Sequence, residues 1–227
     1  MSTELVELLD KIRENKKQRA GYCSGCPLRT DNGPALIECA DVAPRVIVVS
    51  ESPAREPEEV CLNLTDIENW AQRILKEAHH NKDTEPQSAR YMGHFIGGLT
   101  KGRVYGESEA SKTHGLYWTH TVKCFLQRGN VGIGKAKQDR KPEFESAIDQ
   151  CAGYLDEEIA RIDPRLIICV GTSVAGRKLR KSRFADRLSE VYHPRAIKKR
   201  EEKQEKLSAL CQRVRELGLT DLLLACQ

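Results

Sequence analysis

Residues 45–54 read Arg-Val-Ile-Val-Val-Ser-Glu-Ser-Pro-Ala, and this stretch decides the fold class of the 227-residue chain. Its first half is a short, continuous run of β-branched residues, which is typical of a strand buried on both faces in a parallel sheet. Its second half, with two serines and a proline, breaks the strand. The stretch therefore predicts a buried strand with a loop at its carboxyl end.

Strand and helix patterns alternate along the rest of the chain. Thr65 and Glu68 form a capping box ahead of an amphipathic helix, which completes the first strand-loop-helix unit. We expect further strands at 116–122, 166–170 and 190–192, and helices at 142–159 and 196–217. Parallel strands need crossover helices, which cover both faces of the sheet. We therefore predict an α/β fold, a three-layer α/β/α domain around a central, mostly parallel four-stranded sheet.

A single domain is expected to span residues 1–227. A chain of this length buries one ordinary core, and no segment resembles a linker between two domains. The first residues repeat leucine and isoleucine at helical spacing, ahead of a turn-rich segment at 21–33. We expect an N-terminal helix followed by a loop that carries Cys23 and Cys26.

The composition is that of a folded globule, with 39% hydrophobic and 31% charged residues and a formal net charge of +4. No stretch approaches about eighteen apolar residues, and the polar N-terminus lacks the apolar centre of a signal peptide. We therefore expect a cytoplasmic protein that does not enter membranes. Basic residues gather in the C-terminal third. They are interpreted either as a phosphate-binding surface or as a solvated helix face. They are Lys178, Arg180, Lys181, Arg183, Arg195, Lys198, Lys199 and Arg200.

Nine cysteines without a secretion signal favour metal ligation by some of them over a disulfide framework. Cys23 and Cys26 are separated by two residues, so both thiolates can reach one metal site, either zinc or an iron-sulfur cluster. Cys124, just past the second strand, and Cys151, on the following helix, are candidates for the other ligands. Cys151 also fits a core position. The remaining cysteines are interpreted mainly as structural: Cys39, Cys61, Cys169, Cys211 and Cys226.

Four polar side chains lie at the carboxyl ends of the predicted strands, where open α/β sheets bind ligands. They are Glu51, His120, Thr172 and His193. Glu51 fits a carboxylate that orients a water, or an acid that answers a helix dipole. His193 fits an imidazole that stabilises a developing anion, or a surface turn residue. Their convergence indicates an active site.

Five ordered segments resemble the motifs of the uracil-DNA glycosylase superfamily, in particular its iron-sulfur branch, the family 4 and family 5 type. They are residues 49–54, 119–124, the helix from Cys151 to Asp163-Pro164, 166–171, and His193-Pro194. The resemblance extends from Cys23 to about Pro194. It implies a structural [4Fe-4S] cluster held by Cys23, Cys26, Cys124 and Cys151, with zinc as the alternative metal. The N-terminal loop would then be a cluster-binding loop.

The resemblance implies a DNA glycosylase of base-excision repair that hydrolyses the N-glycosidic bond of a flipped-out damaged or deaminated base, uracil or a related one. Glu51 would activate water and His193 would stabilise the leaving base. The implied base-binding residues are His120, Ser50 and Ser52. The implied DNA-binding residues are Pro53, Pro194, Arg195, Lys198 and Lys199. We expect a monomer that binds DNA containing a damaged base.

Two positions and one loop depart from the family's pattern. Ser50 stands where family 4 enzymes carry glycine, and His120 stands where their asparagine reads the uracil edge. A neutral imidazole has one donor and one acceptor on separate atoms, unlike an amide. The family's aromatic loop is absent after the first motif, and Phe95 is a displaced candidate that fits packing better. These departures motivate an alternative, a catalytically inactive iron-sulfur protein that binds nucleic acid on the same scaffold. A zinc-stabilised interaction module is a third hypothesis.

Overall fold

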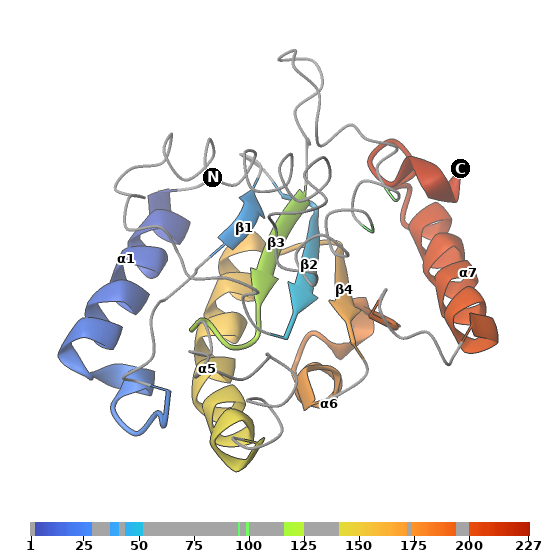
Figure 1. The fold of residues 1–227 in the computed structure, drawn as a ribbon. Helices are drawn as coiled ribbons and strands as arrows, with labels where there is room; N and C mark the ends of the chain where they lie inside the picture. The colour runs from blue at the N-terminus through green and yellow to red at the C-terminus, as the bar shows by residue number, and fades with distance from the viewer. Residues whose placement is uncertain are drawn as a thin grey trace, which may run out of the picture.

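The computed structural model describes residues 3–28, 37–40, 44–51, 95, 99, 116–124, 141–171, 174–193 and 200–227. Figure 1 shows a central sheet with α1 and α5 on one side and α7 on the other. The predicted helix after Thr65 lies outside the described residues. None of the described helices is long and apolar enough to cross a membrane.

Four strands of the sheet run parallel, as the sequence predicts. They are β2 (Val46–Ser50), β3 (Leu116–His120), β4 (Leu166–Val170) and β5 (Leu188–Val191). Their order in the sheet is β3-β2-β4-β5. After β2 the chain forms β3 on one side of β2, and it then crosses over to form β4 and β5 on the other side. The prediction of a three-layer α/β/α fold around a mostly parallel sheet is confirmed.

A fifth strand, β1 (Ile37–Ala40), pairs antiparallel with β3 and forms one edge of the sheet. The sequence analysis did not predict this strand. Four residues with a single β-branched side chain carry too little pattern to distinguish a strand from a loop. Because β1 covers its outer side, β3 is an inner strand, and the polar residues at its end lie inside the sheet rather than at its margin.

The helices follow the sequence pattern closely. They are α1 (Thr3–Gln18), α5 (Lys141–Ile162), α6 (Val174–Arg180) and α7 (Arg200–Glu216). Asp163 follows the end of α5 in the left-handed region, with φ 48°, ahead of Pro164. Gly218, with φ 61°, follows the end of α7, where a residue without a side chain tolerates that conformation.

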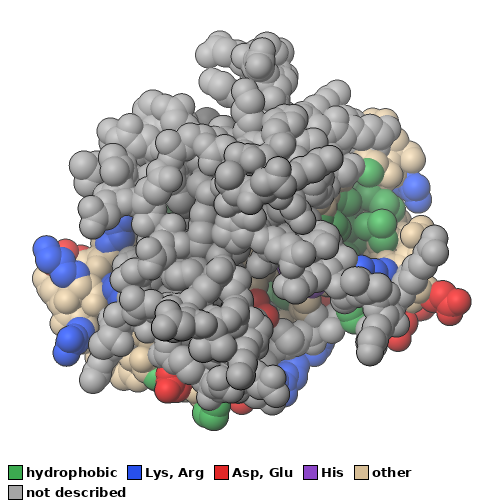
Figure 2. Space-filling model, in the orientation of Figure 1, with side chains coloured by type: hydrophobic (Ala, Val, Ile, Leu, Met, Phe, Trp, Pro, Cys, Tyr) green, Lys and Arg blue, Asp and Glu red, His purple; other side chains and the backbone are tan. Residues whose placement is uncertain are grey.

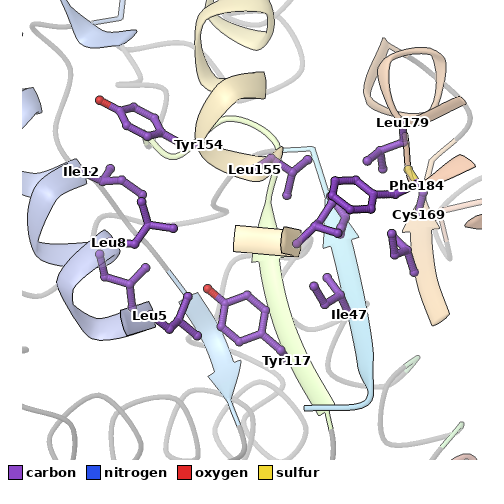
Figure 3. Close-up of a cluster of buried hydrophobic side chains, with 14 of the residues drawn as sticks. Leu5, Leu8, Ile12, Ile47, Tyr117, Tyr154, Leu155, Cys169, Leu179 and Phe184 are labelled. Atoms are coloured by element: carbon purple, nitrogen blue, oxygen red, sulfur yellow. The ribbon is translucent and has the colours of Figure 1, made fainter. Parts of the chain in front are cut away.

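Alternate residues of the strands pack into different layers. Ile47 and Tyr117 face α1 and α5, where they join one hydrophobic core with Leu5, Leu8 and Ile12. Figure 3 shows these α1 side chains pointing toward the two tyrosines of this core. The neighbouring strand positions face α7 in a second core, which also contains Val46, Val48, Trp118, Ile168 and Val214. The sheet is therefore buried on both faces, as its unbroken apolar runs predict.

Cys211 of α7 and Cys226 of η5 (Leu224–Cys226) form a disulfide. The sequence analysis interpreted both as structural cysteines but did not predict their pairing. Their separation of 15 residues includes the turn after α7, and the bond joins the C-terminal segment to that helix. Phe95 packs against the core on the same side of the sheet, which agrees with its interpretation as a packing residue.

Candidate functional site

The carboxyl ends of β2 and β3 bring together three residues singled out from the sequence. Ser50 ends β2 and pairs in register with His120, which ends β3, and Glu51 follows Ser50 directly. Ser50 and His120 are only 6% and 1% exposed, whereas Glu51 is half-buried. Beyond the strands, Thr121 N–H donates to the Ser50 carbonyl at 2.8 Å, and Val122 N–H to the Glu51 carbonyl at 2.9 Å. The two segments are thereby held side by side.

His193 lies at the same edge of the sheet, two residues after the end of β5. The strand order puts β4 between β2 and β5. His193 is half-buried. The structure therefore brings His120 and Glu51 to neighbouring strand ends, and it puts His193 farther along the same edge.

The Ser50 hydroxyl is the centre of a buried hydrogen-bond cluster. Its Oγ lies 2.7 Å from Nδ1 of His120, accepts a hydrogen bond from Nε1 of Trp118 at 3.0 Å, and lies 3.4 Å from the Thr119 carbonyl oxygen. The Trp118 and His120 rings are 5.9 Å apart, centroid to centroid. Trp118 was missed by the sequence analysis. The available signal was its buried indole N–H, which needs an acceptor.

Cys169 of β4 behaves as the structural cysteine that the sequence predicts. Its side chain is fully buried and free. Burial, helped by the charges of Glu190 and Glu51, raises the pKa of this thiol to about 12, and the charge of Arg180 opposes the rise.

The four proposed ligand cysteines are buried and are not disulfide-bonded. Cys26 and Cys124 share one small core with Phe144, Ala147 and Ile148 of the helix that carries Cys151. Burial raises the pKa of Cys124 to about 11, and Cys26 and Cys23 contribute to this rise. Burial, with contributions from Cys124 and Cys26, likewise raises the pKa of Cys151 to about 12, and a hydrogen bond from the Lys123 backbone opposes the rise. Thiols from three segments of the chain thus lie within electrostatic reach of one another.

A cation lies beside this group of cysteines. Lys16 of α1 is 8% exposed, and its Nζ donates to the Leu28 carbonyl at 2.5 Å. Its charge and a hydrogen bond from its side chain oppose the rise in the pKa of Cys124. The Tyr154 hydroxyl lies 3.7 Å from Cys23 Sγ and accepts a hydrogen bond from Asn15 at 2.8 Å. The cysteine loop is therefore attached to both α1 and α5.

Four cysteines as thiolates are the donor set of an iron-sulfur cluster or a structural zinc. In the part of the chain that the structure describes, no three His, Cys, Asp or Glu side chains are grouped as for a single metal ion. A [4Fe-4S] cluster takes one thiolate at each of four irons, so its cysteines surround a larger body. The identity and burial of the four residues fit such a cluster.

A buried ion pair connects the end of β3 to α5. Lys123 Nζ lies 2.5 Å from Oε2 of Glu158, and the two side chains are 1% and 0% exposed. Lys123 also donates to Thr119 Oγ1 at 2.8 Å, and the Tyr117 hydroxyl donates to Oε1 of Glu158 at 3.2 Å. Burial raises the pKa of Glu158, and the charge of Lys123 opposes the rise. Lys123 immediately precedes Cys124, so the pair holds the cysteine-bearing turn against the helix.

The sequence analysis missed this pair, although Glu158 carried a signal. Counting from Cys151, it occupies the seventh following position, on the same helix face as Tyr154, Leu155 and Ile159. An acidic residue on an apolar helix face needs a buried cation or donor. That requirement would have indicated a partner, but not which lysine supplies it.

Two basic residues of the predicted phosphate-binding surface are paired with acids. Lys178 lies 2.5 Å from Asp149, and Arg180 lies 2.5 Å from Glu190. Arg183 stacks over the Phe184 ring at 4.8 Å. In the view of Figure 2, side chains of both signs, Lys or Arg and Asp or Glu, appear where the surface is not drawn in grey. The interpretation of 178–183 as a solvated, ion-paired surface therefore fits better than that of a phosphate-binding surface.

Several predicted site residues lie outside the described residues. They are Ser52, Pro53, Thr172, Pro194, Arg195, Lys198 and Lys199.

A parallel α/β sheet with acidic and imidazole side chains at its carboxyl edge defines a class of protein that binds its ligand at that edge. Comparison with known protein families matches residues 37–216 to the Uracil DNA glycosylase superfamily. The match covers most of the chain, and the protein belongs to this superfamily. No curated protein matches the chain significantly. Membership supports a role of the DNA glycosylase type, and the superfamily acts on DNA. Cys23 and Cys26 precede the matched segment.

Proposed function

We propose that this protein hydrolyses the N-glycosidic bond of a flipped-out damaged or deaminated base in DNA. The observation that carries the proposal is the position of Glu51 beside His120, at adjacent carboxyl ends of β2 and β3. Ligands of open α/β sheets bind at this edge. A half-buried carboxylate there is suited to accept a proton from water.

Each proposed role follows from the chemistry of the bond that breaks. Glu51 accepts a proton from a water, and the water oxygen forms a bond to the sugar carbon. The electron pair of the glycosidic bond leaves with the base, through an oxocarbenium-like transition state. His193 stabilises the negative charge on the departing base. The remaining proposed DNA contacts are Ser52, Pro53, Pro194, Arg195, Lys198 and Lys199.

We also propose that Cys23, Cys26, Cys124 and Cys151 hold a [4Fe-4S] cluster. The support is their shared burial and the contact of their loop with α1 and α5. Hydrolysis transfers no electron, so the cluster would serve as a structural cross-link between the N-terminal loop, the turn after β3 and α5. Lys16 and the Lys123 backbone would face its cysteine ligands.

A panel of labelled oligonucleotides tests the proposed activity. Each oligonucleotide holds uracil, hypoxanthine, xanthine or a mismatched thymine, in single-stranded and duplex form. We expect release of at least one of these bases, detected as alkali-sensitive cleavage at the modified position. Binding of the oligonucleotides without release of any base would overturn the proposal and favour the inactive nucleic-acid-binding alternative.

Glu51→Gln is expected to slow base release by roughly 10²-fold or more, as for the loss of a positioned acid-base group. The amide keeps the shape of the side chain but cannot accept the proton from water. Single-turnover rates measure the effect without a contribution from product release. Glu157→Gln is the matched control, because Glu157 pairs with Lys11 on the surface of α5. Equal rates for Glu51→Gln and wild type would remove Glu51 from the mechanism.

His120→Asn is expected to raise activity on uracil relative to the base that the wild type prefers. An amide offers a donor and an acceptor side by side, which a neutral imidazole does not. A pocket that pairs with a polar edge discriminates by leaving mismatched groups unpaired. The measurement is the ratio of single-turnover rates between bases of the panel. A ratio that does not change would show that His120 has no part in base selection.

A further inference from the structure

The contacts of Ser50 limit how its hydroxyl shares one hydrogen atom. An indole N–H is only a donor, so Trp118 Nε1 occupies one lone pair of Ser50 Oγ at 3.0 Å. The single Ser50 proton then has two acceptors in range. One is His120 Nδ1 at 2.7 Å, and the other is the Thr119 carbonyl oxygen at 3.4 Å. The proton can serve only one of them.

The distances favour His120 as the acceptor. Hydroxyl donors give separations of about 2.7–2.8 Å, whereas N–H donors to oxygen give about 2.9–3.0 Å. The 2.7 Å contact between Ser50 and His120 has the length of a hydroxyl bond, and the 3.0 Å contact from Trp118 has that of an N–H bond. A hydrogen bond from Ser50 to the carbonyl at 3.4 Å would be weak. Ser50 therefore donates to Nδ1.

Burial makes this arrangement persistent. Ser50, Trp118 and His120 are 6%, 2% and 1% exposed, so water does not compete freely for these hydrogen bonds. The register of β2 and β3 holds Ser50 and His120 opposite each other. A nitrogen that accepts a hydrogen bond carries no proton, so the proton of the neutral imidazole lies on the other nitrogen.

We propose that Ser50, oriented by Trp118, fixes neutral His120 as the tautomer protonated at Nε2, so that His120 meets the base as a hydrogen-bond donor. Ser50 is then a positioning residue that acts through His120. The inference rests on the proposed function and specifies the substrate class, which is bases with a carbonyl oxygen at the edge that His120 contacts.

The chemistry of deamination explains why a fixed donor is useful. Adenine and cytosine present exocyclic amino groups, which donate hydrogen bonds. Their deaminated products, hypoxanthine and uracil, carry a carbonyl oxygen at the same place, which accepts them. The Nε2–H group of His120 donates a hydrogen bond to the carbonyl oxygen of a deaminated base. An amino group at the same place is itself a donor, so it forms no hydrogen bond with Nε2–H. The opposite tautomer would have the opposite preference.

The test begins with the tautomer and needs no catalysis. Full-length protein with ¹⁵N-labelled histidine is examined by two-bond ¹H-¹⁵N correlation spectra, at a pH well above the ordinary histidine pKa of about 6.5. His120→Asn identifies the His120 signals among the six histidines. We expect an unprotonated Nδ1 and a protonated Nε2. A protonated Nδ1 would overturn the inference, whatever the protein does to DNA.

Ser50→Ala removes the hydroxyl, and its effect should appear in both the spectrum and the base preference. We expect His120 to populate both tautomers, and the rate ratio of hypoxanthine over adenine, or of uracil over cytosine, to fall by roughly tenfold, the scale of one neutral hydrogen bond. Ser182→Ala is the matched control, because Ser182 donates to the Leu179 carbonyl at 2.8 Å in another part of the fold. An unchanged His120 spectrum in Ser50→Ala would overturn the role of Ser50.

Trp118→Phe provides a second variant in case Ser50→Ala does not fold. It leaves the Ser50 hydroxyl and His120 in place but removes the indole N–H that orients the hydroxyl, so the Nδ1 tautomer should become populated beside the Nε2 tautomer. An unchanged His120 spectrum in Trp118→Phe would contradict the orienting role of Trp118. If the tautomer is as expected but no oligonucleotide releases its base, the proposed function fails and the assignment of the Ser50-His120 pair stands.

Discussion

Cys23→Ala and Cys151→Ala are each expected to abolish the visible colour of the purified protein and to lower its iron content severalfold. Wild-type protein should contain about four iron atoms per chain and absorb broadly in the visible range. Each substitution removes one thiolate from a buried set of four. The remaining three cysteines then leave one iron of a cluster without a protein ligand. Iron and sulfide analysis together with the absorbance spectrum measure the outcome.

Cys169→Ala is the matched control for the cysteine variants. Cys169 is as deeply buried and as free as Cys151, but it lies within β4. Its replacement should preserve the colour and the iron content. Full retention of iron in both Cys23→Ala and Cys151→Ala would contradict the cluster assignment. A colourless wild-type protein with about one bound zinc would instead favour the zinc site.

Lys123→Met is expected to lower the free energy of unfolding by roughly 3–5 kcal/mol, the cost of leaving one partner of a buried ion pair without its counterion. Lys123 and Glu158 are fully buried and 2.5 Å apart. Methionine keeps the length of the side chain but leaves the Glu158 carboxylate, among the described residues, with the Tyr117 and Thr119 hydroxyls. Urea unfolding curves, analysed for midpoint and slope, measure the change.

Two further variants distinguish the stability contribution of the buried pair from that of an ordinary surface pair. Lys11→Met removes the exposed partner of Glu157, the neighbour of Glu158 on α5, and should cost about 0–1 kcal/mol. Adding Glu158→Gln to Lys123→Met should recover part of the lost stability, because a neutral amide is less costly to bury than an unpaired carboxylate. A loss in Lys123→Met no larger than that in Lys11→Met would show that the buried pair contributes little.

The core strands were predictable because their residue pattern fits a buried strand better than a helix or an exposed strand. The β-branched run at 46–49 and the apolar run at 166–170 are too short for helices and too apolar for a solvated face. The observed β2 and β4 agree with them within a residue. β1 was missed because its strand conformation depends on pairing with β3. Four residues that mix apolar and polar side chains do not indicate such a pairing.

The candidate site was predictable in its location but not in its hydrogen bonds. The rule that ligands bind at the carboxyl edge of parallel strands was enough to select Glu51, His120 and His193. The bond between Ser50 and His120 joins residues 70 positions apart and requires the register of β2 and β3. Disulfide formation between Cys211 and Cys226 likewise depends on how the chain turns after α7.

Local pattern was sufficient for the α/β class, the boundaries of the buried strands and the chemical types at the edge of the sheet, because periodicity and residue chemistry are properties of short segments. Which side chains share a proton or a charge depends on distances across strands and layers. His120 acquires its Ser50 partner, and Lys123 its Glu158 partner, only when the sheet is assembled and α5 is packed on it. Burial then strengthens these contacts, since the low-dielectric interior penalises any polar group left unpaired.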